Sequence, residues 1–217
     1  MKRLYIVVEG QTEQEFVNSV IAPYLQNFGI YSVTPTLIHT SRTGKGGMAN
    51  YQHLKNTINL QLVSKKDDFV VTTFIDFFRI PNNMPDYETC MGEGDKMKKV
   101  EMLEEAINKD IADKRFAAYI QLHEFEALLF ADNRGFEYYY PKNITEQTAK
   151  IIEAYNNPED INSSPQGAPS KRLLAINPDY NKVIEGNLVA MEIGIEKIID
   201  KCPRFATWIE KITAMCR

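Results

Sequence analysis

Two acidic residues near the start of the sequence are placed where carboxylates could take part in chemistry. Glu9 follows the apolar residues 4–8 (LYIVV), and Glu13 comes four residues later, after a glycine. Carboxylate oxygens are the ligands that Mg²⁺ prefers, so one carboxylate could hold a metal ion while the other orients water as a general base. A purely structural interpretation is also open. A helix dipole favours Glu13 in a first turn, and Glu9 could pair with a lysine.

Further acidic residues follow two other apolar stretches. Asp76 lies in residues 69–78 (FVVTTFIDFF), and Glu124 and Glu126 come just after residues 116–121. The carboxyl ends of parallel strands share one edge of a sheet, so these side chains would converge there and repel one another unless a cation neutralised them. We therefore expect Glu9, Glu13, Asp76, Glu124 and Glu126 to form a Mg²⁺ or Mn²⁺ site. Asp76 could instead cap the following loop.

Basic residues near the same edge could bind phosphate. Arg42 and Lys45 lie in residues 40–47 (TSRTGKGG), which are glycine-rich but lack the spacing of a P-loop. Lys171 and Arg172 follow a proline-rich stretch and could form a second phosphate clamp or the solvated start of a helix. His123, at the end of a predicted strand, is a further candidate for offsetting charge on phosphoryl oxygens.

The hydrophobic pattern predicts the elements that would position these residues. Strands are expected at residues 4–8, 30–39, 69–78 and 116–121, and helices at about 12–25, 49–63, 96–112 and 123–130. Thr12 and Glu15 fit a capping box for the first helix. The alternation predicts an α/β fold with a mostly parallel four-stranded sheet flanked by helices.

The character of the sequence changes after residue 135. Residues 136–143 are interpreted as an aromatic loop, 157–172 as a loop, and 145–156 and 188–214 as helical. We expect an α/β core over residues 1–135 and a mainly helical extension over 136–217 that packs on it as a cap.

Composition limits the possible settings. The chain has 217 residues, of which 44% are hydrophobic, and contains no apolar run of membrane-spanning length. Its three cysteines lack metal-site spacing, so a reduced cytoplasm is expected and a zinc site is not. The net charge of −4 gives no overall attraction to nucleic acid, so such binding would need a local basic patch or bridging metal ions.

Residues 8–13 (VEGQTE) resemble the EGxTE element that opens Toprim domains, the metal-binding modules of topoisomerases, primases and OLD-family nucleases. Nearly the whole chain is similar to a bacterial Toprim-like family of unknown function. The stretches that carry this similarity are VEGQTEQEFV, FIDFFRIP, YIQLHEFEALLF, PSKRL and EIGIEKI with the later CPRF and tryptophan.

The resemblance implies a Rossmann-like fold and roles for particular residues. Glu9 would act in catalysis as general base or with the metal, and Glu13 would be a further metal ligand. The DxD motif maps onto residues 76–78, where Phe78 replaces the second acid, so Glu124 or Glu126 would have to supply the missing carboxylate. By analogy with the basic residue of OLD sites, Lys171 would stabilise a phosphate.

Two main functions are compatible with these observations. The first is a Mg²⁺- or Mn²⁺-dependent nuclease that acts with an AAA-type ATPase encoded nearby, in a phage-defence-like system. The second is a non-catalytic Toprim-like scaffold or sensor that binds nucleic acid or a partner protein, which the missing second acid and the net acidity favour. A binder of a small phosphorylated ligand is a third possibility.

Overall fold

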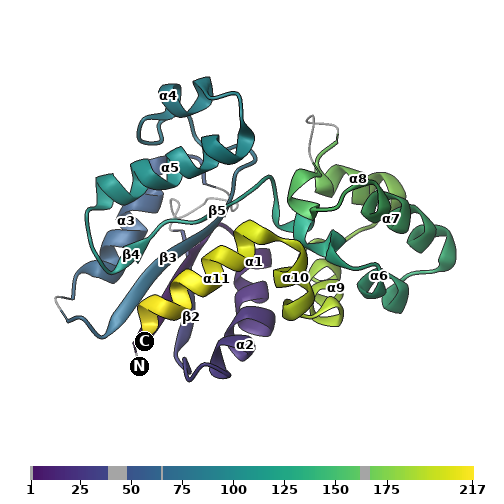
Figure 1. The fold of residues 1–217 in the computed structure, drawn as a ribbon, viewed down its shortest axis with the longest axis horizontal. Coiled ribbons are helices and arrows are strands. Elements are labelled where there is room, and N and C mark those ends of the chain that lie inside the picture. Colours follow the sequence, from purple (N-terminus) through teal and green to yellow (C-terminus); the bar gives the residue numbers. More distant parts are fainter. Residues whose placement is uncertain (1, 39–47, 65, 162–166) are drawn as a thin grey trace.

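A parallel sheet forms the centre of the protein. We describe a computed structural model that covers residues 2–38, 48–64, 66–161 and 167–217. Its strands are β1 (Arg3–Val8), β2 (Val33–Leu37), β3 (Phe69–Asp76), β4 (Phe116–Ala117) and β5 (Ile120–Gln121). The strand order is β2-β1-β3-β4, with β5 also paired to β3, and every pairing is parallel (Figure 1). The predicted α/β fold is confirmed.

Strand β3 is buried along its whole length, in agreement with its β-branched and aromatic sequence. Two of its residues are threonines, whose hydroxyls need partners in the core. Thr72 Oγ1 donates to the carbonyl of Ala117 at 2.6 Å, and Thr73 Oγ1 donates to that of Tyr119 at 2.7 Å. These bonds attach residues 117–119 to β3. Here the single fourth strand predicted from the sequence is divided into β4 and β5.

The first helical segment begins one residue before the predicted capping box. It runs without a break through α1 (Gln11–Phe16), the π-helical turn η1 (Val17–Ile21) and α2 (Ala22–Gln26). Gly10 is the N-cap, and Glu13 Oε2 accepts a hydrogen bond from its N–H at 3.0 Å. The predicted box of Thr12 and Glu15 is therefore wrong. Glu13 occupies the capping position, and Glu15 is exposed.

Helices cover both faces of the sheet. On one face lie α3 (Tyr51–Leu62) and α5 (Lys96–Ile111), with the short α4 (Tyr87–Gly92) beside them, and the first helical segment and α11 (Pro203–Cys216) lie on the other (Figure 1). Side chains of β1 alternate between the two cores, because successive residues of a strand point to opposite faces. Val7 belongs to the α3–α5 side, whereas Ile6 and Val8 belong to the α11 side.

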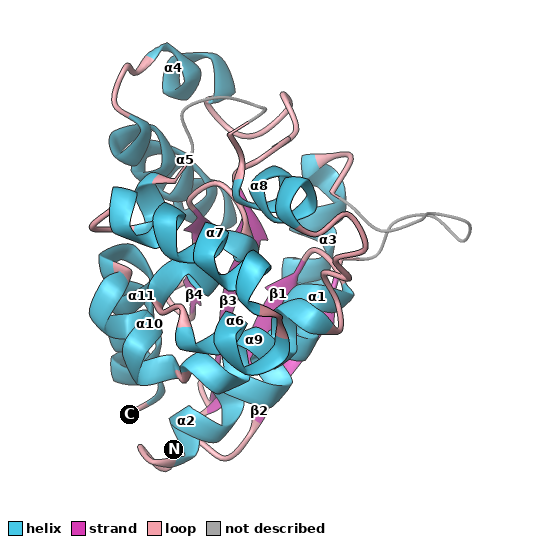
Figure 2. Ribbon diagram, turned by 90° about the vertical axis from the view of Figure 1, so that its right-hand side faces the viewer, coloured by secondary structure: helices cyan, strands magenta, loops and turns pink. Residues whose placement is uncertain are grey.

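The C-terminal part is helical, with more helices than the sequence predicted. The helix predicted at residues 123–130 is the 3₁₀ helix η2 (Phe125–Ala131). The chain after it contains the 3₁₀ helix η3 (Pro158–Asp160) and the helices α6 (Arg134–Tyr139), α7 (Lys142–Ala154), α8 (Pro169–Ile176), α9 (Glu185–Ile193), α10 (Ile195–Lys201) and α11. The predicted aromatic loop at residues 136–143 is wrong, since α6 covers its first half and α7 begins at its end. The predicted loop at residues 157–172 is interrupted by η3, and α8 begins within its last four residues. Figure 2 shows α6 to α9 together in front of the sheet. The division between residues 135 and 136 stays a prediction.

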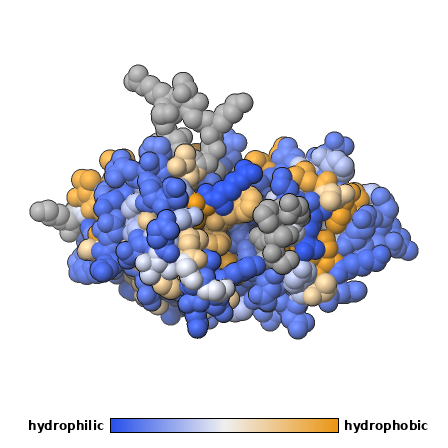
Figure 3. Space-filling model, turned by 90° about the horizontal axis from the view of Figure 1, so that it is seen from above, coloured by the Kyte–Doolittle hydropathy of each residue, from blue (hydrophilic) through white to orange (hydrophobic). Residues whose placement is uncertain are grey.

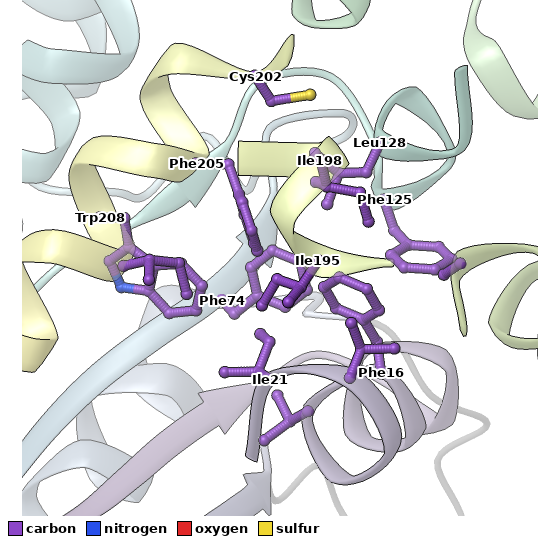
Figure 4. Packing of buried hydrophobic residues seen from close by; sticks show 14 of the residues in the cluster. Phe16, Ile21, Phe74, Phe125, Leu128, Ile195, Ile198, Cys202, Phe205 and Trp208 are labelled. Carbon is purple, nitrogen blue, oxygen red and sulfur yellow. The ribbon is translucent and has the colours of Figure 1, made fainter. Parts of the chain in front are cut away.

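Aromatic side chains join the last helices to the sheet. Phe16, Phe74, Phe205 and Trp208 lie in one buried cluster (Figure 4), in which the Phe74 and Trp208 rings stack with centroids 5.4 Å apart. The indole Nε1 of Trp208 donates to Thr72 Oγ1 at 2.9 Å, which satisfies both groups in the core. Within the described ranges, no helix is both long and apolar enough to cross a membrane.

Candidate carboxylate–lysine site

Four acidic side chains from different elements converge at the carboxyl end of the sheet, and we call them the acid cluster. They are Glu9 after β1, Glu13 in α1, Asp76 at the end of β3 and Glu126 in η2. Lys182 Nζ lies 3.5 Å from Glu13 Oε1, 3.6 Å from Asp76 Oδ2 and 3.4 Å from Glu126 Oε2. The structure therefore brings together the acids predicted at the ends of β1 and β3, and adds a lysine that the sequence did not indicate.

Backbone N–H groups fix three of the four carboxylates. Glu9 Oε1 accepts from Met48 N at 3.2 Å, Glu13 Oε2 from Gly10 N at 3.0 Å and Asp76 Oδ1 from Phe125 N at 2.9 Å. Glu126 is fully buried, and among the described residues neither of its carboxylate oxygens has a hydrogen-bond partner. A buried carboxylate without a hydrogen bond is costly, so this group requires a compensating charge.

Burial dominates the electrostatics of the cluster. It raises the pKa of Glu9 and Glu126, and it raises the pKa of Asp76 well above its ordinary value. Lys182 opposes each of these pKa increases, whereas neighbouring carboxylates add to them. Burial lowers the pKa of Lys182, but Asp76, Glu126 and Glu13 together outweigh it and raise that pKa. The ammonium thus stays charged because the carboxylates surround it.

Lys182 belongs to the segment between α8 and α9. The side chain of Asn187 holds this segment against α1, because its Nδ2 donates to Val183 O at 2.9 Å and to Thr12 O at 3.2 Å. A single lysine in a polar stretch is typical of a solvated charge, so no local pattern could have identified it. Only the packing of α9 on α1 brings it to the carboxylates.

Glu124 has a different role from Glu126, although the sequence predicted both as metal ligands. Its two oxygens accept hydrogen bonds from Ser170 N at 3.1 Å and from Ser170 Oγ at 3.0 Å, in the first turn of α8. Glu124 thus anchors α8, while Glu126 points to Lys182. Of these two acids, the structure places Glu126 in the acid cluster.

The predicted basic residues do not join the cluster in the part of the chain that the structure describes. Lys171 is exposed on α8, and Arg172 donates to Gly167 O at 2.7 Å and to the Tyr155 hydroxyl at 3.0 Å. Burial, aided by Lys96, lowers the pKa of His123 to about 4, so its imidazole is neutral at pH 7 and supplies no positive charge. Arg42 and Lys45 lie outside the described residues.

The donor set fits a hard divalent cation in chemistry but not in spacing. Carboxylates are suitable ligands for Mg²⁺, and Glu126 accepts no hydrogen bond from the described residues and pairs only loosely with Lys182. However, the oxygens lie 3.4–3.6 Å from a common centre, whereas Mg–O bonds are about 2.1 Å. Accordingly, no three acidic, histidine or cysteine side chains of the described residues are spaced to hold a metal ion. The spacing is that of a site filled by an ammonium group.

A separate cavity of about 290 Å³ lies between α5 and α11 and shares no residue with the acid cluster. Its polar wall contains Glu104 and Arg204, which cover the edge of the sheet. Glu104 Oε1 accepts from Ile120 N at 2.8 Å, and Arg204 Nη2 donates to Ile120 O at 3.3 Å. These side chains satisfy the backbone groups that an edge strand leaves free, which accounts for their burial without any ligand.

The face over the carboxyl ends of the strands is mostly hydrophilic, with some hydrophobic residues in its middle (Figure 3). Comparison with known proteins adds one finding. A family model described as a domain of unknown function (DUF4276) matches residues 8–213. No curated protein and no solved structure matches the chain.

Proposed function

Because this chain belongs to the DUF4276 family, whose function is unknown, we propose a function from its site: hydrolysis of phosphodiester bonds in nucleic acid, with Mg²⁺ or Mn²⁺ as cofactor. The observation that carries the proposal is the acid cluster, in which four carboxylates gather, three of them pair with one ammonium, and buried Glu126 accepts no hydrogen bond from the described residues. The resemblance of residues 8–13 to the opening element of Toprim domains supports the same function.

The charge balance favours a divalent cation. Asp76 and Glu126 are almost completely buried, and burial penalises their ionised forms. One ammonium offsets one of the four negative charges that the cluster carries when fully ionised. We propose that Glu9, Glu13, Asp76 and Glu126 hold the metal, with Glu126 in place of the acid that Phe78 replaces. A bound Mg²⁺ or Mn²⁺ would activate water and offset charge on phosphoryl oxygens.

Side chains of this protein would supply the remaining chemistry. Glu9 accepts its Met48 hydrogen bond through Oε1, so its Oε2 is the candidate atom to take a proton from the attacking water. Among the described residues, Lys182 is the positive group that pairs with the acid cluster, and we assign it the phosphate-stabilising role that the resemblance implies for Lys171. Phosphate contacts by Arg42, Lys45 and Arg172, and an ATPase partner, remain part of the proposal.

One observation favours the alternative of a non-catalytic scaffold or sensor. Lys182 already forms ion pairs with three carboxylates, as a structural lysine would in a site that has lost its metal. In that case the protein would bind nucleic acid or a partner protein without cleaving it.

Calorimetric titration with Mn²⁺ separates these functions. We expect saturable binding to the wild-type protein and a loss of affinity of at least about tenfold in Glu9→Gln and Asp76→Asn, because each removes a charged ligand while retaining its shape. Glu15→Gln, exposed in the same helix as Glu13, is the matched control and should bind as wild type does. Absence of binding, or binding that neither site variant weakens, would favour the scaffold.

Cleavage assays follow if metal binds. Plasmid DNA, single-stranded DNA and RNA are incubated with protein and Mn²⁺, with Glu9→Gln prepared in parallel to reveal contaminating nuclease. We expect cleavage by wild type and a reduction of about a hundredfold or more in the variant. Equal cleavage by both preparations would contradict an active site at Glu9.

A further inference from the structure

We infer that Lys182 is an internal competitor of the metal: in the metal-free protein its ammonium takes the position of the cation, and a divalent ion must displace it to bind. The inference rests on the proposed function, because it concerns regulation of the same site. It makes the metal-free state an autoinhibited state held by one side chain.

The ammonium of Lys182 is shared among three carboxylates and is not the partner of any single one. The distances from Nζ to oxygens of Glu13, Asp76 and Glu126 differ by only 0.2 Å, between 3.4 and 3.6 Å. A directed hydrogen bond between an ammonium and a carboxylate is shorter, about 2.7–2.9 Å. The three carboxylates, from three different elements, therefore share one central charge, and none of them binds it alone.

Two cations cannot share this centre. A divalent ion would need carboxylate oxygens at about 2.1 Å, which requires the oxygens to move inward to the place that Nζ occupies. The ammonium and the metal would then repel each other across a few ångströms of poorly solvated space. Removal of Lys182 from the centre is thus a condition for metal binding.

The lysine is also the part of the site that is able to leave. Its side chain is 38% exposed, whereas those of Glu13 and Glu126 are 5% and 1% exposed. Glu9, Glu13 and Asp76 are held by backbone N–H groups, and Asn187 holds the segment beside Lys182 against α1. A lysine has a flexible four-carbon side chain, so the ammonium can turn toward solvent while the backbone stays in place.

Mn²⁺ titration of charge variants tests the competition. Lys182→Met removes the ammonium and keeps most of the length of the side chain, so we expect Mn²⁺ to bind about tenfold or more tightly than to wild type. Lys182→Arg retains the charge and should give no gain, and Lys171→Met, on exposed α8, should bind as wild type does. Unchanged or weaker affinity in Lys182→Met would overturn the inference.

A second measurement uses the wild-type protein and so does not depend on the folding of a variant. Amine acetylation at each lysine is followed by mass spectrometry with and without Mn²⁺. We expect Lys182 to react slowly in the metal-free protein and at least about threefold faster with Mn²⁺, because displacement frees its amine, while Lys171 is unaffected. A rate at Lys182 that Mn²⁺ leaves unchanged or lowers would contradict displacement.

The outcomes distinguish this inference from the proposed function. If wild type and Lys182→Met bind Mn²⁺ equally, the competition is wrong and the metal site stands. If neither binds, both proposals are wrong. If only Lys182→Met binds, the competition is correct, and the wild-type protein is the scaffold of the alternative function because its lysine excludes the metal.

Discussion

At the scale of single residues, neighbouring acids in the sequence have different tasks. Glu124 and Glu126 are two positions apart, yet one anchors α8 and the other faces Lys182. Glu124 precedes η2 with an extended backbone, and Glu126 lies in its first turn, so their side chains leave in different directions. Glu13 combines two tasks, since one oxygen caps α1 and the other pairs with Lys182.

Replacement of Glu126 tests whether its buried charge lowers the stability of the metal-free protein. The folded-state pKa of Glu126 is raised, so its contribution to stability is present at low pH and is lost as pH rises above its ordinary value of 4.5. We expect Glu126→Gln to raise the free energy of unfolding at pH 8 by roughly 1 kcal/mol, as measured by urea denaturation without metal.

The same series checks the sign of this effect. The advantage of Glu126→Gln should disappear near pH 4, where the wild-type carboxyl is also neutral. Glu15→Gln is the control, because Glu15 is exposed. A variant that is less stable than wild type at pH 8 would mean that the ion pair with Lys182 stabilises the fold more than burial of the carboxylate destabilises it.

At the scale of elements, α11 closes one face of the sheet, and one side chain couples it to β3. Trp208 stacks on Tyr119 with centroids 4.6 Å apart and donates to Thr72 Oγ1. Because Thr72 Oγ1 in turn donates to Ala117 O, the bond links α11 to the end of β4 at the edge of the sheet. Docking of the C-terminal helix and alignment of the edge strand therefore depend on each other.

A double-mutant cycle measures this link. Trp208→Phe removes the indole donor, and Thr72→Val removes its acceptor at nearly constant shape. We expect each single variant to lose about 2 kcal/mol in urea denaturation followed by circular dichroism, because each removes the buried hydrogen bond between Trp208 and Thr72, and Thr72→Val also leaves the indole N–H unpaired. The double variant should lose about 1 kcal/mol less than the sum, and strictly additive losses would show that the bond contributes nothing.

At the scale of the whole molecule, two titrating groups outside the acid cluster give opposing pH dependences. Burial raises the pKa of Glu104 from 4.5 to about 7 despite Arg204, so its stabilising contribution is lost as pH rises through that interval. Burial lowers the pKa of His123 from 6.5 to about 4, so its contribution is lost as pH falls through that interval. In the wild-type protein, these two opposite changes of the free energy of unfolding with pH partly cancel.

Removal of the Glu104 carboxyl should leave only the pH dependence of stability that comes from His123. Relative to wild type, we expect Glu104→Gln to gain roughly 2 kcal/mol in free energy of unfolding between pH 5 and pH 7. The measurement is urea denaturation at several pH values, with the tryptophan fluorescence of Trp208 as the signal. Glu101→Gln, whose side chain is 54% exposed, is the control and should follow wild type. If Glu104→Gln changed the free energy of unfolding by the same amount at every pH, the raised pKa of Glu104 would be contradicted.

Local patterns in the sequence determined the sheet and much of its acidic edge. Apolar runs specify strands buried on both faces, and parallel strands place their carboxyl ends together, so the sequence alone assigns Glu9 and Asp76 to one edge. Capping details and the helices after residue 135 were less predictable, because short helices in polar, proline-containing sequence have weak periodicity.

Only the tertiary structure decided what faces those carboxylates. Lys182 reaches Glu13, Asp76 and Glu126 because α9 packs on α1, and the choice of Glu126 over Glu124 depends on where α8 docks. The physical reason is that hydrophobic periodicity acts between neighbours along the chain, whereas a buried ion cluster is formed by charges that are distant in sequence and meet only after the core has assembled.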